Sequence, residues 1–218
     1  EWEWSRSKYQ DLLRVTGGVE RITHFVRTER PGELPEDTMA ATVKELHMAK
    51  TEHYVAAMER GDVPLRPGVE RLMIEARDAG VRLAIATTTS APNVEALLRS
   101  SPDSVRMDWF EVIGAGGVVP NKKPAPDIYD WTLTRLALPP QRCLALEDSR
   151  NGLDSATAAG IPTVVTTSSF TRKQDFAGAL AVADSLGEVD APMRMAVGDA
   201  RGKPCISLAL LRAWHATV

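Results

Sequence analysis

From residue 68 to residue 166, short apolar runs alternate with segments of helical periodicity. The pattern predicts strands at 81–87, 109–113, 142–146 and 161–166, and helices at 68–78, 91–100, 126–137 and 149–159. Continuous apolar strands separated by helices are typical of a parallel sheet that is covered on both faces. The sequence therefore predicts an α/β fold with a ligand site at the carboxyl ends of the strands.

The first 62 residues follow a different pattern, without any predicted strand. Helices are expected at 4–14, 18–28 and 36–60, and the Gly- and Pro-containing segment 60–68 is typical of a linker or hinge. We therefore expect a small all-helical domain at 1–62 and an α/β core at 63–218. Within the core, the stretch 188–202 is expected to be irregular, and a last helix is expected near 207–215.

Charge and composition argue against several classes of protein. The 218 residues carry a formal net charge of -3, and the Lys and Arg residues are dispersed, which argues against nucleic-acid binding. No apolar run approaches the roughly 18 residues expected of a membrane helix. Cys143 and Cys205 form no Cys-x-x-Cys motif, which suits a reducing compartment. We expect a monomer in the cytoplasm, or in the plastid stroma of a photosynthetic eukaryote, with a small molecule as its partner.

Hydroxyl side chains gather where the predicted strand 81–87 ends. Thr87, Thr88, Thr89 and Ser90 lead into the next helix, and free backbone N–H groups at a helix start favour an anion. The run predicts a phosphate cradle. The simpler alternative is an ordinary Ser/Thr helix cap.

A pair of lysines precedes the predicted helix 126–137. Because Lys123 is followed by Pro124, its backbone is restrained, and its ammonium group is suited to meet a phosphoryl oxygen. The alternative is a solvated pair, Lys122 and Lys123, ahead of a helix start.

Two adjacent acids, Glu147 and Asp148, follow the apolar strand 142–146. Neighbouring carboxylates repel one another unless a cation lies between or beside them, and Mg²⁺ prefers such oxygen ligands. The pair therefore indicates a magnesium site. The alternative is a helix N-cap by Asp148 or Ser149, with Glu147 solvated.

The order of these three segments resembles that of the haloacid dehalogenase-type phosphatases and phosphomutases. Further segments resemble the CbbY branch of that family and extend the likeness over nearly the whole chain; they are WEWSRSKYQDLLRVTGGVERI at 2–22, HMAKTEHYV at 47–55, LRPGVERL at 65–72, ATTTSAPNVEALL at 86–98 and EDSRNGLDSA at 147–156. The resemblance implies a helical cap over a Rossmann-like core. It also implies magnesium-dependent hydrolysis of a sugar phosphate, such as xylulose 1,5-bisphosphate, through an aspartyl-phosphate.

The resemblance also implies roles for particular residues. Lys123 and Thr87 would be catalytic, with Thr88 and Asn93 beside the transferring phosphate, and Glu147 and Asp148 would hold Mg²⁺. Ser149 and Asn151 would shape the surrounding loop. The residues that would face the sugar and its distal phosphate are Gly17, Gly18, Arg21, His47 and Lys50. A β-phosphoglucomutase-like phosphomutase and a non-catalytic sugar-phosphate-binding member remain as alternatives.

Three features depart from the family pattern. The Asp-x-Asp-Gly-Thr segment that ends the family's first strand has no counterpart before the helical segments, so we expect the chain as given to be inactive and to be a fragment of a longer protein. The missing strand would lie between strands 81–87 and 142–146, and its loss would leave two edges without partners. Val19 stands where the branch typically has Lys, and Gly117 where relatives usually have Asp.

Overall fold

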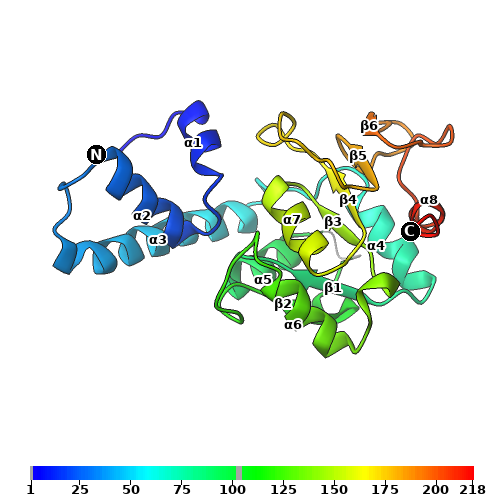
Figure 1. Ribbon diagram of the computed structural model, residues 1–218, viewed down its shortest axis with the longest axis horizontal. Helices are drawn as coiled ribbons and strands as arrows, with labels where there is room; N and C mark the ends of the chain where they lie inside the picture. The colour runs from blue at the N-terminus through cyan, green and yellow to red at the C-terminus, as the bar shows by residue number, and fades with distance from the viewer. Residues whose placement is uncertain (1, 102–104) are drawn as a thin grey trace.

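The computed structural model describes residues 2–101 and 105–218. Three helices, α1 (Arg6–Leu12), α2 (Gly18–Glu29) and α3 (Glu36–Glu59), lie to one side of the remaining elements (Figure 1). The Ser5 hydroxyl caps α1 by accepting a hydrogen bond from the Lys8 amide. Apolar side chains of the three helices pack in one cluster, which contains Leu12, Ile22, Phe25, Val26, Met39 and Val43. These helices confirm the predicted segments to within a few residues.

The remaining elements alternate between helices and strands, as the apolar pattern predicts. In chain order they are α4 (Val69–Asp78), β1 (Leu83–Ala86), α5 (Ala91–Ser100), a 3-10 turn (Met107–Trp109), β2 (Phe110–Gly114), α6 (Asp127–Leu136), a second 3-10 turn (Pro140–Arg142), β3 (Ala145–Glu147), α7 (Arg150–Ala158), β4 (Thr163–Thr166), β5 (Ala181–Ala183), β6 (Met195–Val197) and α8 (Leu208–His215). The α/β fold is therefore confirmed.

The strands form two separate sheets. Strands β1 and β2 pair in parallel, and the second sheet has the order β3-β4-β5-β6, in which only the β5–β6 ladder among the described residues is antiparallel. Strand β4 is an inner strand, and its Val164 and Val165 are fully buried. By contrast, Leu146 on the edge strand β3 is 44% exposed. No ladder among the described residues joins β1 to β3, so each presents one edge without a strand partner.

Strand β6 corrects one expectation. The stretch 188–202, predicted to be irregular, contains this short strand, which pairs with β5 through Val182–Val197 and Ala183–Met195. Because Val197 is 49% exposed and the strand spans only three residues, it leaves no recognisable apolar run in the sequence.

No helix in the described part of the chain is both long and apolar enough to cross a membrane.

Arg66 ties the segment before α4 to the ends of two strands. One terminal nitrogen donates to the carbonyl and the hydroxyl of Thr166, and the other donates to the carbonyls of Thr167 and Asp184. These distances run from 2.6 to 3.1 Å. The chain is thereby fixed to the carboxyl ends of β4 and β5 just after it leaves the helices α1–α3.

Candidate active site

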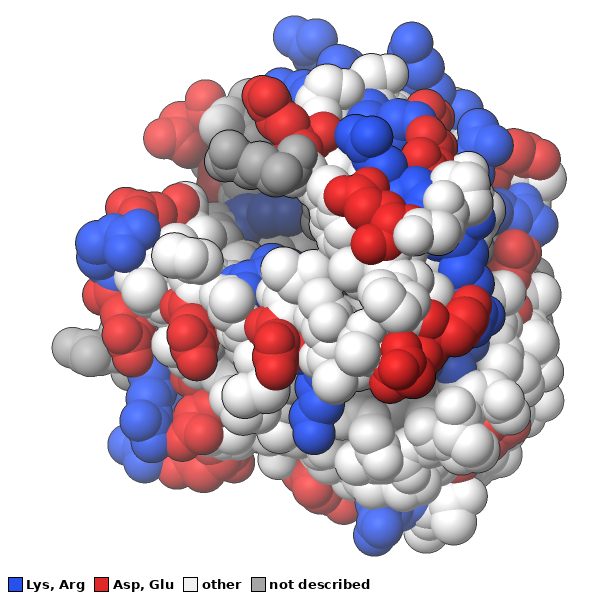
Figure 2. All heavy atoms as spheres, turned by 90° about the vertical axis from the view of Figure 1, so that its left-hand side faces the viewer, with Lys and Arg blue, Asp and Glu red and all other residues white. Residues whose placement is uncertain are grey.

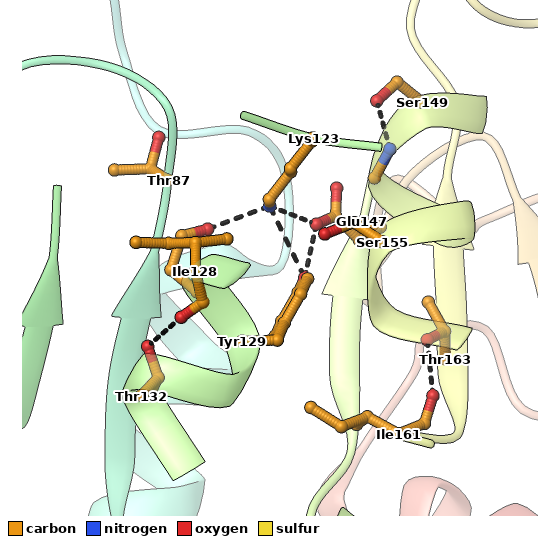
Figure 3. A network of polar contacts seen from close by, with 12 residues as sticks. Thr87, Lys123, Ile128, Tyr129, Thr132, Glu147, Ser149, Ser155, Ile161 and Thr163 are labelled. Atoms are coloured by element: carbon orange, nitrogen blue, oxygen red, sulfur yellow. Dashed lines mark hydrogen bonds and ion pairs between the residues drawn. The ribbon is translucent and has the colours of Figure 1, made fainter. Parts of the chain in front are cut away.

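Lys123 connects the two separate sheets. Its Nζ donates to the carbonyl of Ala86, the last residue of β1, at 2.9 Å, and forms an ion pair with Oε1 of Glu147, the last residue of β3. The side chains of Lys123 and Glu147 are 11% and 7% exposed. Figure 3 shows the lysine between these strand ends, with Thr87 following β1. Lys123 therefore spans the space between the two unpaired strand edges.

Tyr129 completes this group of side chains, and the sequence analysis missed it. Its hydroxyl donates to the same Oε1 of Glu147 and lies 3.5 Å from Lys123 Nζ, which stands 4.7 Å from the centre of the tyrosine ring. Burial raises the pKa of Tyr129 well above its ordinary value, and the charges of Glu147 and Asp148 raise it further. The tyrosine thus remains a hydrogen-bond donor. We call Lys123, Tyr129 and Glu147 the buried cluster.

Gly152 makes room for the Glu147 carboxylate. A Cβ added at Gly152 would lie 1.8 Å from Glu147 Oε2, so any larger residue would displace the carboxylate. The start of α7 is capped by Ser149, whose hydroxyl accepts from the Gly152 amide at 3.2 Å. The helix-cap alternative is therefore correct for Ser149. It is wrong for Glu147, which is buried rather than solvated.

Asp148 follows Glu147 and is the second candidate ligand for magnesium. The residue has exposed surface, yet the surrounding protein desolvates its carboxylate, which raises its pKa; the charge of Glu147 adds to this, and those of Arg66 and Lys123 oppose it. Figure 2, viewed from the side of α1–α3, shows a hollow in this face of the molecule with Lys or Arg atoms at its depth.

The two carboxylates fit part of a magnesium shell. A divalent cation beside them would relieve their mutual repulsion, and Mg²⁺ in proteins is commonly held by one or two carboxylates together with waters and phosphate oxygens. Within 2–101 and 105–218, no group of three or more His, Cys, Asp and Glu side chains is placed to hold a metal. Any further ligands would come from water, from substrate or from other residues.

The hydroxyl run after β1 is held by local hydrogen bonds. The Thr87 amide continues the ladder to the Gly114 carbonyl at 2.8 Å, the Thr89 amide donates to Thr87 Oγ1, and Asn93 Nδ2 donates to Thr89 Oγ1 at 2.9 Å. Ser90 precedes α5, but its hydroxyl does not cap the helix. Ser90 Oγ and Asn93 Oδ1 are buried and have no hydrogen-bond partner among the described residues. Buried polar atoms of this kind are satisfied when a polar ligand or water binds.

The residues predicted to face the sugar lie on α2 and α3 or, for Gly17, at the N-cap of α2, apart from the buried cluster. His47 touches the start of α2, where a Cβ on Gly18 would lie 2.4 Å from its ring, and Arg21 Nε donates to the Leu12 carbonyl. Desolvation lowers the pKa of His47, as do the charges of Lys50 and Lys122, while Glu20 opposes them. His47 therefore lies against the start of α2, and Lys50 lies near enough to Arg21 for the charge of Arg21 to lower its pKa.

Two residues beside the predicted motifs connect this group to the α/β elements. Asn151 Nδ2 donates to Thr16 Oγ1 at 2.7 Å and to the Arg14 carbonyl at 3.1 Å, so it faces the helices rather than the acid pair. Lys122 forms an ion pair with Glu20 on α2 at 2.7 Å. We call the group of Glu20, His47, Lys50 and Lys122 the seam.

A separate cavity of about 420 Å³ at the end of α6, around Leu133 and Pro139, contains none of these residues.

Comparisons with known proteins agree with this architecture. The model of the haloacid dehalogenase-like hydrolase family matches residues 3–160. Protein CbbY from Cereibacter sphaeroides is 47% identical over 191 residues, which cover 87% of this chain and 80% of that protein. The CBBY-like protein of Arabidopsis thaliana is 36% identical over 188 residues, covering 85% of this chain and 59% of the plant protein.

Solved structures give the same result. The crystal structure of CbbY from Rhodobacter sphaeroides in complex with phosphate matches with a TM-score of 0.77 and 47% identity, over 85% of this chain and 80% of that one. A CbbY mutant in complex with xylulose-(1,5)bisphosphate matches with a TM-score of 0.78 and 46% identity, over 87% and 84% of the two chains. The family model and the high identity over most of the sequence place this chain in the haloacid dehalogenase-like hydrolase family, as a CbbY-like member.

Proposed function

We propose that this protein is a magnesium-dependent phosphatase that hydrolyses a sugar phosphate, with xylulose 1,5-bisphosphate as the first candidate. The observation that carries the proposal is the position of Lys123, which connects the carboxyl end of β1 with Glu147 on β3. The ammonium group of Lys123 at this position would contact a phosphate that is bound by the hydroxyl run after β1. The bisphosphate complex of a CbbY relative supports this substrate class.

Each residue of the site has a part in the proposed reaction. Thr87 and the Thr88 amide hold the transferring phosphate, with Asn93 behind them, and Lys123 stabilises negative charge that develops on its oxygens. Glu147 and Asp148 would hold Mg²⁺, which would supply further charge neutralisation when bound. Tyr129 holds the Glu147 carboxylate in place by donating to Oε1, the same oxygen that pairs with Lys123.

The sequence contains no Asp-x-Asp motif, which in this family supplies the attacking aspartate. We propose that it belongs to a further strand, which pairs with the free edges of β1 and β3 in the complete protein. The exposed Leu146 on β3 supports this, since an apolar side chain on an inner strand is normally buried. The aspartate would attack phosphorus as the ester oxygen leaves with a proton from an acid, and water would then cleave the aspartyl-phosphate.

The helices α1–α3 would act as a cap over this site. Gly17, Gly18, Arg21, His47 and Lys50 would then face the sugar and its second phosphate. Asn151 supports the arrangement, because it ties residues 14–16 to the helix that follows the acid pair.

The proposal is tested by measuring phosphate release from xylulose 1,5-bisphosphate by the complete native protein. We expect turnover with Mg²⁺, none with excess EDTA, and none from the 218-residue chain by itself. Conversion of β-glucose 1-phosphate to glucose 6-phosphate would instead favour a phosphomutase. Binding of sugar phosphates without any phosphate release in the presence of Mg²⁺ would favour a non-catalytic member and contradict the proposal.

A further inference from the structure

Lys122 and Lys123 are neighbours in sequence but have different surroundings. Lys123 is nearly buried and has three polar partners, namely the Ala86 carbonyl, Glu147 and Tyr129. Lys122 is 29% exposed, and its ion pair is with Glu20, which is 44% exposed. The second lysine therefore lies one residue from the buried cluster and points toward α2.

The Lys122–Glu20 pair rests on the backbone of a glycine. A Cβ on Gly17 would lie 2.0 Å from Glu20 Oε2 and 2.9 Å from Lys122 Nζ. The residues just before this glycine are held by Asn151, which donates to the Arg14 carbonyl and to Thr16 Oγ1. A substrate with one phosphate at Lys123 and a carbon chain that extends toward α2 therefore meets Lys122 beside Gly17.

Positive charge exceeds negative charge at the seam. Desolvation, followed by the charge of Arg21, lowers the pKa of Lys50, and desolvation together with Lys50 and Lys122 lowers the pKa of His47. Desolvation acts to raise the pKa of Glu20, but the hydrogen bond and charge of Lys122 outweigh it, so this pKa is lowered. Two lysines and a single carboxylate, Glu20, thus act on His47, and a second anion would be attracted by this excess of positive charge.

The ion pair is well suited to exchange. Solvent-accessible pairs contribute little net stability, because both groups lose hydration and side-chain freedom when they meet. A phosphate group presents several acceptor oxygens to an ammonium, and charge-assisted hydrogen bonds to it are roughly twice as strong as neutral ones. The buried Lys123–Glu147 pair lacks this freedom.

We propose that Lys122 determines specificity: it leaves Glu20 and binds the second anionic group of a doubly charged sugar phosphate. The proposal rests on the proposed function and defines its substrate class as sugars that carry a second phosphate or carboxylate. Glu20 is then paired with Lys122 only while the substrate is absent, and so competes for Lys122 with singly charged or mispositioned ligands.

The test compares Lys122→Gln and Glu20→Gln in the complete native protein. For xylulose 1,5-bisphosphate, Lys122→Gln should lower kcat/KM by about 10- to 100-fold, chiefly through KM, as loss of a hydrogen bond to a charged group implies. For β-glucose 1-phosphate the effect should stay within about twofold, since this substrate has no second phosphate. Glu20→Gln should lower KM for the bisphosphate. Lys8→Gln, which breaks the exposed Lys8–Glu29 pair on the helices, is the matched control.

Calorimetric binding of the same two compounds separates this inference from the proposed function. If the wild-type protein releases no phosphate but Lys122→Gln still weakens bisphosphate binding selectively, the phosphatase proposal fails and the Lys122 inference stands. Equal losses for both compounds, or weaker bisphosphate binding in Glu20→Gln, would overturn the inference.

Discussion

The buried cluster and the seam use the same kinds of side chain in opposite ways. In the cluster, Lys123 and Glu147 are almost inaccessible, and Tyr129 and the Ala86 carbonyl hold them in one arrangement. At the seam, Lys122 and Glu20 form the same kind of lysine–glutamate ion pair, at a separation comparable to that of Lys123 and Glu147. Unlike the cluster pair, however, they remain in contact with water. The first group is fixed by its partners, and the second is free to change partners.

This difference suggests a division of labour. Charge stabilisation at a reacting phosphate benefits from groups that do not reorganise during the reaction. Substrate selection benefits from groups that give up a weak internal partner for a stronger external one. Adjacent lysines in a single loop meet both needs, because the loop places one ammonium inside the α/β elements and the other outside.

The largest expected contrast comes from removing each lysine in turn. Lys123→Ala leaves the buried Glu147 carboxylate without its cation, and we expect a loss of about 3–5 kcal/mol in the free energy of unfolding. Lys122→Ala removes the same charge from an accessible pair and should cost no more than about 1 kcal/mol. Urea denaturation of both variants measures the difference, and equal losses would show that the cluster is not buried as described.

A smaller contrast is expected from two glycines, one in each region. Gly152→Ala should destabilise the protein by about 1–3 kcal/mol, because its Cβ meets the fixed Glu147 carboxylate at 1.8 Å and this outweighs the usual gain of a helical alanine. Gly18→Ala meets the His47 ring at 2.4 Å, but this ring is the far end of a half-buried side chain whose Nδ1 has no hydrogen-bond partner among the described residues, so it can shift at lower cost. Thermal unfolding should therefore show a clear drop in Tm only for Gly152→Ala. A larger drop in Tm for Gly18→Ala than for Gly152→Ala would contradict the proposed difference between the buried cluster and the seam.

The smallest effect concerns the pH dependence of the seam. The pKa of His47 is lowered, so as pH falls below about 6.5 the unfolded chain takes up a proton before the folded protein does, and stability decreases. Lys50 on α3 and Lys122 disfavour the charged ring, and Glu20 on α2 favours it. Denaturation at pH 7.5 and 5.5 should show a smaller decrease for His47→Gln than for the wild type. His24→Gln, on the exposed side of α2, should behave like the wild type.

The sequence predicts the parts of the site that depend on strand order. The end of β1 and Glu147 on β3 lie within reach of the same lysine because parallel strands bring their carboxyl ends to one edge, and apolar runs identify those strands. Tyr129 could not be predicted in this way. On a helical wheel it is an ordinary core aromatic, and its hydroxyl meets Glu147 only because of how α6 packs against β1, β2 and α7.

The seam was even less accessible to sequence reasoning. The ion pair between Glu20 and Lys122 and the hydrogen bonds from Asn151 to residues 14 and 16 depend on how the helices α1–α3 are placed over the α/β elements. Local periodicity carries no information on that placement. The family resemblance points to two members of the seam, His47 and Lys50, but nothing in the sequence pairs Lys122 with Glu20.

Arg66 has a consequence for how the helices α1–α3 can move. Its guanidinium is anchored to carbonyls at Thr166, Thr167 and Asp184, so the chain from that point onward moves with β4 and β5. Helix α3 ends at Glu59. If α1–α3 act as the proposed cap and move over the site, the chain on this side of the helices would have to bend within residues 60–65. Spin labels placed before and after this segment would report such a movement.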